Sequence, residues 1–218
     1  MCTSKTKQKI LDAAISLFHT KGYAGTSVRE IAKKADVNAA NISYYFDGKI
    51  GLLETLVTSF LEKYLSIVEQ AYLEKDSKTA KECLVKMSRN IMVYQKEYHL
   101  LARFVHRETT FDTVLIREIM TTYLMKEKYY FKTILEMGMD KNEFRNLPIP
   151  YVIIQLKGML SMPYLQPQYM SEVLHIQINE MYFIEQYMKE LEKWINQTLS
   201  SQITRTKIIP TMTIAPTV

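Results

Sequence analysis

Two short helical patterns, separated by only three residues, lie near the start of the chain. In the first pattern, apolar residues recur at the spacing of one helix face: Val28, Ile31, Ala32 and Ala35. Ser27 and Glu30 form the signature of a capping box, so we expect this helix to begin after Ser27. Asp36-Val37-Asn38 breaks the pattern, and the second helix is expected over residues 39–46 with Asn38 as its cap. Together the two patterns predict a helix-turn-helix.

The turn between these two helices must bend the chain sharply, so one of its residues is expected to need a positive φ. Asp36 tolerates that conformation better than most residues with a side chain. Val37 is apolar in a polar turn and is expected to fill the space between the helices, while Ile42 and Phe46 should face the core. A helix-turn-helix lays its second helix in the major groove of DNA, with the N-terminal end toward bases and phosphates.

Helical periodicity continues through most of the rest of the chain. Only six Gly and six Pro occur among 218 residues, which favours long helices over a turn-rich β fold. The stretch 162–167 contains Pro163, and we expect an interruption there because proline cannot continue an α-helix. The expected helices after the helix-turn-helix run over about 48–68, 79–96, 98–108, 113–137, 151–161 and 168–199.

These patterns predict an all-α protein with two domains and a tail. Residues 1–48 are expected to form an N-terminal three-helix domain that contains the helix-turn-helix. Residues 49–199 are expected to form a larger C-terminal helical domain for dimerisation or regulation. Periodicity is lost from about Ser200, so residues 200–218 are expected to be a disordered tail.

Positive charge is concentrated in the first quarter of the chain. Residues 1–50 hold eight of the Lys and Arg residues and four of the Asp and Glu residues, a net charge of +4 out of +5 for the whole chain. A basic segment on a nearly neutral body is typical of a protein that binds a polyanion. On charge alone, a basic surface that is merely solvated is an equally good interpretation.

The sequence gives no sign of enzymatic chemistry. It contains no GxGxxG, P-loop, HExxH or GxSxG motif. His99 and His106 share one helical face, but a metal site needs more ligands at close spacing, so we expect no metal and no cofactor. Cys2 and Cys83 form no CxxC motif. Without a signal-peptide core or a run of about 18 apolar residues, a cytoplasmic protein is expected.

The N-terminal segment resembles the TetR family of bacterial regulators. About 45 consecutive residues match the family in order and spacing, which is more specific than a helix-turn-helix pattern alone. The matching residues are Lys9-Ile10-Leu11-Asp12-Ala13-Ala14, Leu17-Phe18, Lys21-Gly22-Tyr23, Thr26-Ser27-Val28-Arg29-Glu30-Ile31-Ala32, Ala35-Asp36-Val37, Ile42-Ser43-Tyr44-Tyr45-Phe46, Lys49 and Leu52-Leu53. The resemblance implies a sequence-specific regulator, typically a repressor, that binds double-stranded DNA.

The resemblance also implies roles for individual residues. Thr26 and Ser27 at the start of the second helix, and Lys49 at the start of the fourth, should contact phosphates. Arg29 could contact a phosphate or remain a solvated charge. Asn41 can pair with a base edge, preferably that of adenine. The residues implied to lie on the DNA-facing side of the recognition helix are Asn38, Ala39, Ala40, Asn41, Tyr44 and Tyr45.

For the C-terminal domain the resemblance implies a homodimer and often an internal ligand pocket. Two-fold symmetry implies a palindromic operator. The sequence does not separate interface from core among the apolar residues of the last two helices: Ile153, Leu156, Leu160, Leu174, Ile178, Met181, Ile184, Tyr187, Met188, Leu191 and Ile195. A set rich in aromatic and Met residues, which includes Met87, Phe104, Tyr129, Tyr130 and Phe131, could line an apolar cavity or be plain helical core.

Two runs, at residues 26–32 and 41–46, look like the RefZ type of this family, known from Bacillus. That resemblance implies a nucleoid-associated factor, connected with sporulation, that acts on cell division through the protein FtsZ and needs no small-molecule inducer. Arg103, Arg107, Arg117 and Glu118 could then be a partner or regulatory surface; an internal salt-bridge network and solvated charge are the alternatives. A closed apolar cavity would instead favour a repressor that a ligand releases from DNA.

Overall fold

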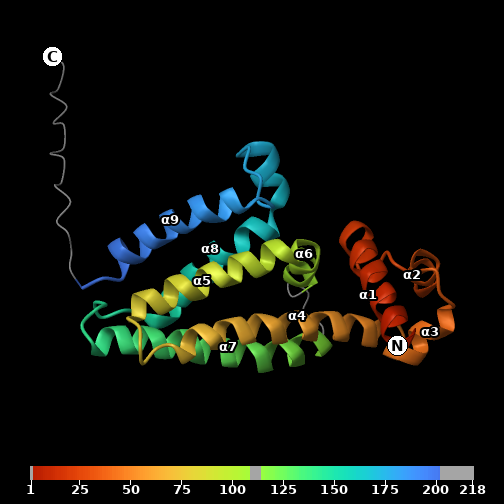
Figure 1. Ribbon diagram of the computed structural model, residues 1–218, viewed down its shortest axis with the longest axis horizontal. Helices are drawn as coiled ribbons and strands as arrows, with labels where there is room; N and C mark the ends of the chain where they lie inside the picture. Colours follow the sequence, from red (N-terminus) through yellow and green to blue (C-terminus); the bar gives the residue numbers. More distant parts are fainter. Residues whose placement is uncertain (1, 109–113, 202–218) are drawn as a thin grey trace, which may run out of the picture.

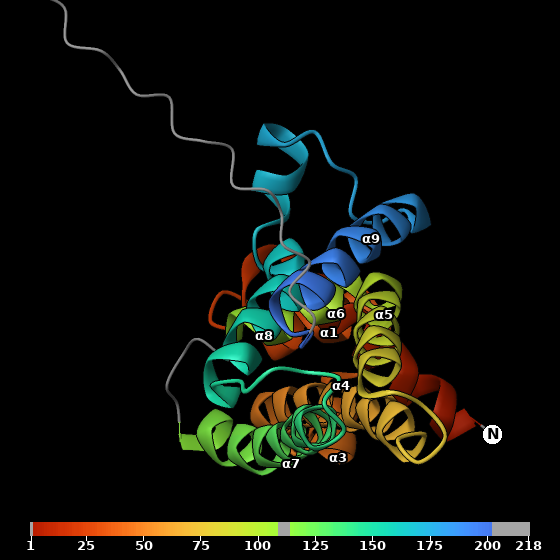
Figure 2. The same cartoon turned by 90° about the vertical axis from the view of Figure 1, so that its left-hand side faces the viewer.

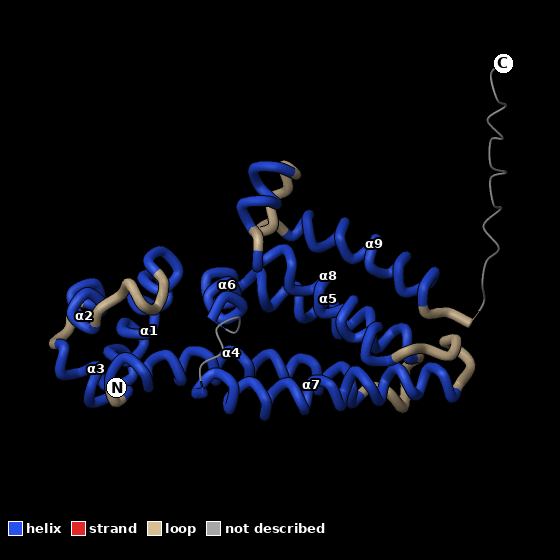
Figure 3. Tube along the Cα trace, turned by 180° about the vertical axis from the view of Figure 1, so that it is seen from behind, coloured by secondary structure: helices blue, strands red, loops and turns tan. Residues whose placement is uncertain are grey.

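The protein is described here by a computed structural model that covers residues 2–108 and 114–201. Within these ranges the regular structure is helical and strands are absent (Figure 3). The elements are α1 (Cys2–Lys21), α2 (Val28–Ala35), α3 (Ala39–Phe46), α4 (Gly48–Leu73), α5 (Ala80–Glu97), α6 (His99–Glu108), α7 (Val114–Asp140), α8 (Ile149–Leu165), the π-helical turn η1 (Tyr169–Val173) and α9 (Met181–Thr198). The predicted all-α class is confirmed, and α2 and α3 have the predicted bounds.

The three N-terminal helices α1, α2 and α3 lie at one end of the long axis of the molecule, and α4 leads from them into the larger C-terminal part (Figure 1). There α4 packs along α5 and α7. Seen along the long axis, α4 and α7 form one side of the bundle while α8 and α9 lie on the other (Figure 2). The helix α4 therefore contributes residues to both parts of the molecule.

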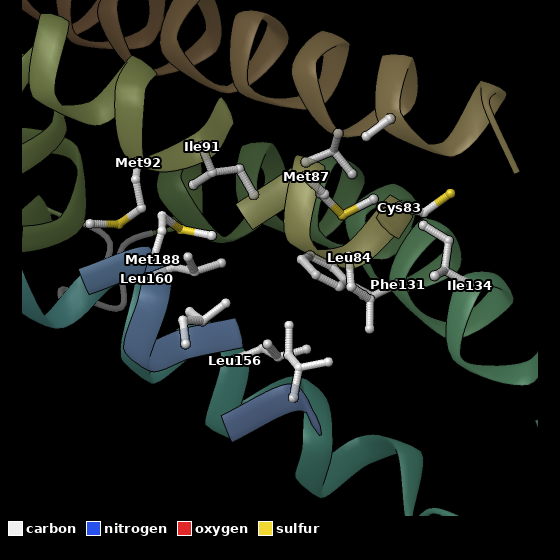
Figure 4. Close-up of a cluster of buried hydrophobic side chains, with 14 of the residues drawn as sticks. Cys83, Leu84, Met87, Ile91, Met92, Phe131, Ile134, Leu156, Leu160 and Met188 are labelled. Atoms are coloured by element: carbon white, nitrogen blue, oxygen red, sulfur yellow. The ribbon is translucent and has the colours of Figure 1, made fainter. Parts of the chain in front are cut away.

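The C-terminal part has a packed core to which α4, α5, α7, α8 and α9 contribute (Figure 4). Met87 and Ile91 from α5, Phe131 from α7 and Leu156 from α8 are fully buried in it. Most of the apolar residues of α9 point into this core as well. The sequence did not decide whether the apolar residues of the last two helices belong to the interface or to the core. Those that are buried are Leu156, Leu160, Ile178, Ile184, Met188, Leu191 and Ile195.

A second core joins the N-terminal helices to α6 and to the first half of α4. The rings of Phe18 in α1 and Phe104 in α6 stack with their centroids 5.1 Å apart. Beside them, Nη2 of Arg107 donates a hydrogen bond to the Phe18 carbonyl at 2.7 Å. A cation at the C-terminal end of a helix stabilises its free carbonyls and its dipole. Arg107 therefore holds α1 to the body of the protein, while its side chain remains 37% exposed.

The interruption expected within 162–167 lies at Gln166, where α8 ends after Leu165, and not at Pro163, which lies inside the helix. Proline has no N–H to give to the carbonyl of Met159, one helical turn earlier. The hydroxyl of Tyr187 in α9 donates to that carbonyl instead, at 2.8 Å. The packing of α9 thus replaces the hydrogen bond that the proline removes.

The single helix expected over 168–199 is also wrong. The chain forms η1, then a loop, and only then α9. Met170 in η1 and Ile178 in the loop are both buried in the core, and His175 between them adopts φ of 55°. A left-handed residue does not fit a right-handed α-helix, so the chain bends there. Of the expected tail, Ser200 pairs with Phe144, and residues 202–218 lie outside the described part of the chain.

Candidate nucleic-acid interface

The turn between α2 and α3 has the geometry that the sequence predicts. Asp36 is left-handed, with φ 55° and ψ 53°, and its N–H is bonded to carbonyls at the end of α2. Val37 is half-buried and packs against the N-terminal core. Oδ1 of Asn38 accepts a hydrogen bond from the N–H of Ala40 at 2.9 Å, so Asn38 caps α3 as expected. These contacts fix the angle at which α3 leaves the turn.

One face of α3 is anchored and the other is open. Ile42 and Phe46 are buried, as the sequence predicts. On the opposite face the side chain of Tyr44 is 79% exposed, and Asn41 is half-buried. The ring of Tyr45 packs partly against the core and lies edge-on to that of Tyr44, with centroids 5.0 Å apart. The remaining residues at the start of this helix are the exposed Asn38 and Ala40 and the half-buried Ala39.

The start of α2 carries the expected capping box. Oγ of Ser27 accepts from the N–H of Glu30 at 3.2 Å, and the Glu30 carboxylate accepts from the N–H of Ser27 at 2.8 Å. Lys21 forms an ion pair with Glu30 at 2.6 Å. The hydrogen bond from Lys21, followed by those from Ser27, lowers the pKa of Glu30 to about 2. Glu30 therefore remains ionised and keeps the exposed Ser27 at the end of the helix.

Among the residues expected to contact phosphates, Thr26 needs a correction. Its side chain is only 2% exposed, and its hydroxyl donates to the carbonyl of Gly22 at 2.8 Å. Thr26 thus closes the turn after α1, and its hydroxyl is not available to DNA. Arg29 is exposed. Nζ of Lys49 lies 4.3 Å from the centroid of the Tyr23 ring, a cation–π contact that holds the ammonium beside the N-terminal helices.

The C-terminal part contains a partly open cavity of about 320 Å³ between α4, α5, α6, α7 and α8. Its walls are mainly apolar, but Glu127 and Lys157 form an ion pair in it. The hydroxyl of Tyr64 donates to Oε1 of the same carboxylate at 2.5 Å. The other lining residues are Phe60, Leu61, Ile91, Gln95, Val105, His106, Met120, Leu124, Leu160, Ser161 and Leu165.

This lining differs from the aromatic and Met residues that the sequence suggested. Met87 and Phe131 belong to the packed core, and Tyr129 and Tyr130 lie in an outer groove between α4 and α7. The sequence does contain a signal for this site, which is a charged residue on the apolar face of α7. Glu127 follows Met120 and Leu124 and precedes Phe131 on one face of α7. A carboxylate at such a position is buried only when it is paired.

His106 also lines the cavity, at the junction with α6. Its Nε2 lies 2.6 Å from Oε1 of Gln95, and Nε2 of Gln95 donates to the carbonyl of Leu160 at 3.0 Å. Since an amide oxygen only accepts, Nε2 of His106 carries the proton of a neutral ring. Burial, with the nearby charge of Lys157, lowers the pKa of His106 from 6.5 to about 4. The imidazole therefore stays neutral at physiological pH.

We expect His106 to make the protein less stable as the pH falls below 6.5. The unfolded chain takes up a proton at His106 near pH 6.5, whereas the folded protein does so only near pH 4. Between these values the unfolded state binds more protons, so the free energy of unfolding decreases as the pH falls. From pH 7.5 to pH 5 the wild type should lose about 2 kcal/mol more than a His106→Gln variant in urea denaturation. Equal losses in the two proteins would contradict this assignment.

The outward face of α8 is unusually apolar. Tyr151 and Ile154 are 67% and 65% exposed, Met162 and Leu165 are also exposed, and all four lie at helical spacing with Gly158 between them. A Cβ at Gly158 would meet nothing within 4 Å. We call these five residues the α8 stripe. Contiguous exposed apolar surface of this kind marks an interaction site.

The residues suggested as a partner surface are spread over two helices. Arg103 is half-buried and donates to Oε1 of Gln168 at 3.3 Å. Arg117 and Glu118 are exposed near the start of α7.

Across residues 2–108 and 114–201, His, Cys, Asp and Glu side chains gather nowhere in a group of three that could hold a metal ion. Nor does any helix in these ranges have the length and apolar character needed to cross a membrane.

Comparison with known proteins identifies the class. The family profile described as "Bacterial regulatory proteins, tetR family" matches residues 10–56, which run from α1 into the start of α4. A relative that matches nearly the whole chain at high identity is a transcriptional regulator of the helix-turn-helix type. The chain belongs to the TetR family of bacterial regulatory proteins, so it is a transcriptional regulator and not an enzyme.

That relative is the "Probable HTH-type transcriptional regulator YttP" of Bacillus subtilis (strain 168). It is 53% identical to this chain over 190 residues, which cover 87% of this chain and 92% of YttP. Among solved structures, a tetR-family regulatory protein from Rhodococcus RHA1 matches with a TM-score of 0.72 and 17% identity over 86% of this chain and 95% of that one. FadR of Bacillus subtilis in complex with stearoyl-CoA matches with a TM-score of 0.68 and 21% identity over 85% of this chain and 97% of that one. Both structures share the fold.

Proposed function

We propose that the protein is a sequence-specific repressor that binds palindromic double-stranded DNA as a homodimer through α3. The observation that carries the proposal is the two-sided construction of this helix. Ile42 and Phe46 hold it in the core, while Asn41 and Tyr44 face outward beside a basic N-terminal segment. Asn41 can read an adenine edge, and the Tyr44 hydroxyl can donate to a phosphate. Ser27, Arg29, Lys49 and the exposed residues at the start of α3 supply further contacts to the backbone of DNA.

An Asn41→Ala or a Tyr44→Ala substitution should weaken DNA binding without changing stability, because both side chains lie on the open face of α3. Loss of one such hydrogen bond costs about 1–3 kcal/mol, or about 5- to 150-fold in affinity. Fluorescence anisotropy with an operator found by genome-wide mapping of bound sites measures the effect. Tyr129→Ala, which removes an exposed tyrosine of α7, is the matched control and should bind like the wild type. Wild-type affinity in both α3 variants would rule out this helix as the reading element.

The proposed homodimer rests on the α8 stripe. Its apolar side chains belong to one of the last two helices, and they are exposed while the apolar side of α9 is largely buried in the core. A two-fold axis through the middle of α8 would place each stripe on its copy, with Gly158 allowing a close approach of the two helices. Such a dimer presents two copies of α3, as a palindrome requires.

A second candidate function, release from DNA by a small molecule, is favoured by the cavity. Its volume of about 320 Å³ is within the range of small-molecule sites. Phe60 and Leu61 of α4 and Val105 of α6 line it, and both helices also pack against the N-terminal core. A ligand that changed their positions would move the helix-turn-helix. The structure of FadR with stearoyl-CoA shows that one protein of this fold binds a small molecule.

A role in cell division through FtsZ, like that of the RefZ type, remains a further proposal. It rests on the resemblance of residues 26–32 and 41–46. The exposed Arg117 and Glu118 are the residues of the suggested partner surface that a second protein could reach most easily. The genome-wide map separates the two functions: a few palindromes near one chromosomal region favour the division role, and a site upstream of the protein's own or a neighbouring gene favours repression.

A further inference from the structure

We infer that the cavity takes an organic ammonium ion, whose charged group pairs with Glu127 while its apolar part fills the rest of the cavity. The inference rests on the proposed role of the cavity as an effector site and names the chemical class of the effector. The observation that supports it is the ion pair of Glu127 and Lys157, whose two partners differ greatly in their exposure to water.

The carboxylate is the buried partner of this pair. The side chain of Glu127 is 4% exposed, whereas that of Lys157 is 38% exposed. Tyr64 donates its hydroxyl to Glu127 from α4, so the carboxylate has one fixed neutral donor and one cation. Burial of an unpaired carboxylate costs several kcal/mol, so Glu127 must keep a cationic partner.

The difference in exposure decides which kind of ligand can enter. An ammonium ligand can replace Lys157 at Glu127, because the long side chain of Lys157 can turn toward water, where its charge is solvated. Glu127 is then still paired. A carboxylate ligand would have to take Lys157 away from Glu127 and would leave the buried carboxylate without a cation. The exchange of one cation for another therefore costs far less than the exchange of one anion for another.

The rest of the lining fits the apolar part of such a ligand. Leu61, Ile91, Met120 and Leu124 supply aliphatic surface, and Phe60 adds an aromatic ring. Apart from the ion pair of Glu127 and Lys157, the ionisable groups that line the cavity are His106 and Tyr64, and both are neutral at physiological pH. His106 is bonded to Gln95 as a neutral ring, and Tyr64 carries its proton because burial and the charge of Glu127 raise its pKa. Glu127 is thus the single anchor for a positive charge in the lining of this cavity.

Calorimetry with two matched probes tests the inference. The probes are 4-phenylbutylamine and 4-phenylbutyrate, which share the ring and a short chain and carry opposite charges. The wild-type protein should bind the amine and not the carboxylate. Glu127→Gln should weaken amine binding at least tenfold, whereas Lys157→Met should retain or strengthen it, because the competing cation is gone. The amine should also raise the melting temperature of Lys157→Met more than that of the wild type.

Tighter binding of the carboxylate, no binding of either probe, or unchanged amine affinity in Glu127→Gln would overturn the inference. Circular dichroism shows whether each variant is folded. If Lys157→Met is not folded, Lys157→Gln is used in its place. Operator binding is measured separately by anisotropy, with and without the amine. Binding of the amine without release of DNA would support the ligand class and overturn the effector role. Absence of operator binding without the amine would instead count against the DNA-binding proposal.

Discussion

Replacing Ile154 by Asp should convert the protein into a monomer and lower its affinity for a palindromic operator by more than 100-fold. Ile154 is 65% exposed near the middle of the α8 stripe, so the substitution should leave the fold of one chain unchanged. In the proposed dimer the carboxylates of both copies would be buried among the apolar side chains of the two stripes, which costs several kcal/mol. Two linked binding modules gain about 10²–10⁴ over one module, and a monomer loses that gain.

Analytical ultracentrifugation and operator binding measure the two parts of this prediction. Met125→Asp is the matched control, because Met125 is a similarly exposed apolar residue that lies in the groove between α4 and α7. It should remain dimeric and bind the operator normally. If Ile154→Asp stayed dimeric, the interface would lie elsewhere. If it became monomeric and still bound the full operator tightly, dimerisation would not be needed for recognition.

Replacing Lys157 by Met should destabilise the protein by about 3 kcal/mol, whereas Glu127→Gln should cost clearly less. The methionine leaves the nearly buried carboxylate of Glu127 with only the hydroxyl of Tyr64. Removing one partner of a buried pair typically costs about 3–5 kcal/mol, and partial access of the site to water reduces that figure. In Glu127→Gln the amide can still accept the Tyr64 hydrogen bond, and Lys157 can reach solvent.

Urea denaturation at pH 7.5 gives both free energies of unfolding. The double variant Glu127→Gln/Lys157→Met contains no charge at this site and is the control. Its stability should lie close to that of Glu127→Gln, because the loss in Lys157→Met comes from the unpaired carboxylate and not from the methionine. Equal destabilisation by the two single substitutions would mean that the difference in burial has no energetic consequence, and it would remove the basis for an ammonium ligand.

The sequence predicted the helix-turn-helix to within a residue because its determinants are local. The capping box of Ser27 and Glu30, the left-handed Asp36 and the cap at Asn38 each involve side chains within a few positions of the backbone that they fix. The buried and exposed faces of α3 follow from helical periodicity in the same way. These features need no information about the rest of the chain.

The sequence was less reliable where a distant segment supplies the missing interaction. Pro163 continues α8 because Tyr187, from another helix, takes over the Met159 carbonyl. For Pro163 the competing partner is a tertiary neighbour, which overrides the local preference. Thr26 differs, because its hydroxyl donates to the carbonyl of Gly22, only four residues earlier, and this local turn removes it from the expected phosphate contact.

What the sequence alone determined is therefore the all-α class, the helix-turn-helix and the buried and exposed faces of α3, because periodicity and capping are encoded in neighbouring positions. Only the tertiary structure decided that Arg107 ties α1 to α6, that Glu127 and Lys157 meet in a cavity, and that α8 rather than α9 leaves an apolar stripe exposed. Each of these depends on which helix faces lie opposite each other, and the pattern within a single helix does not contain that information.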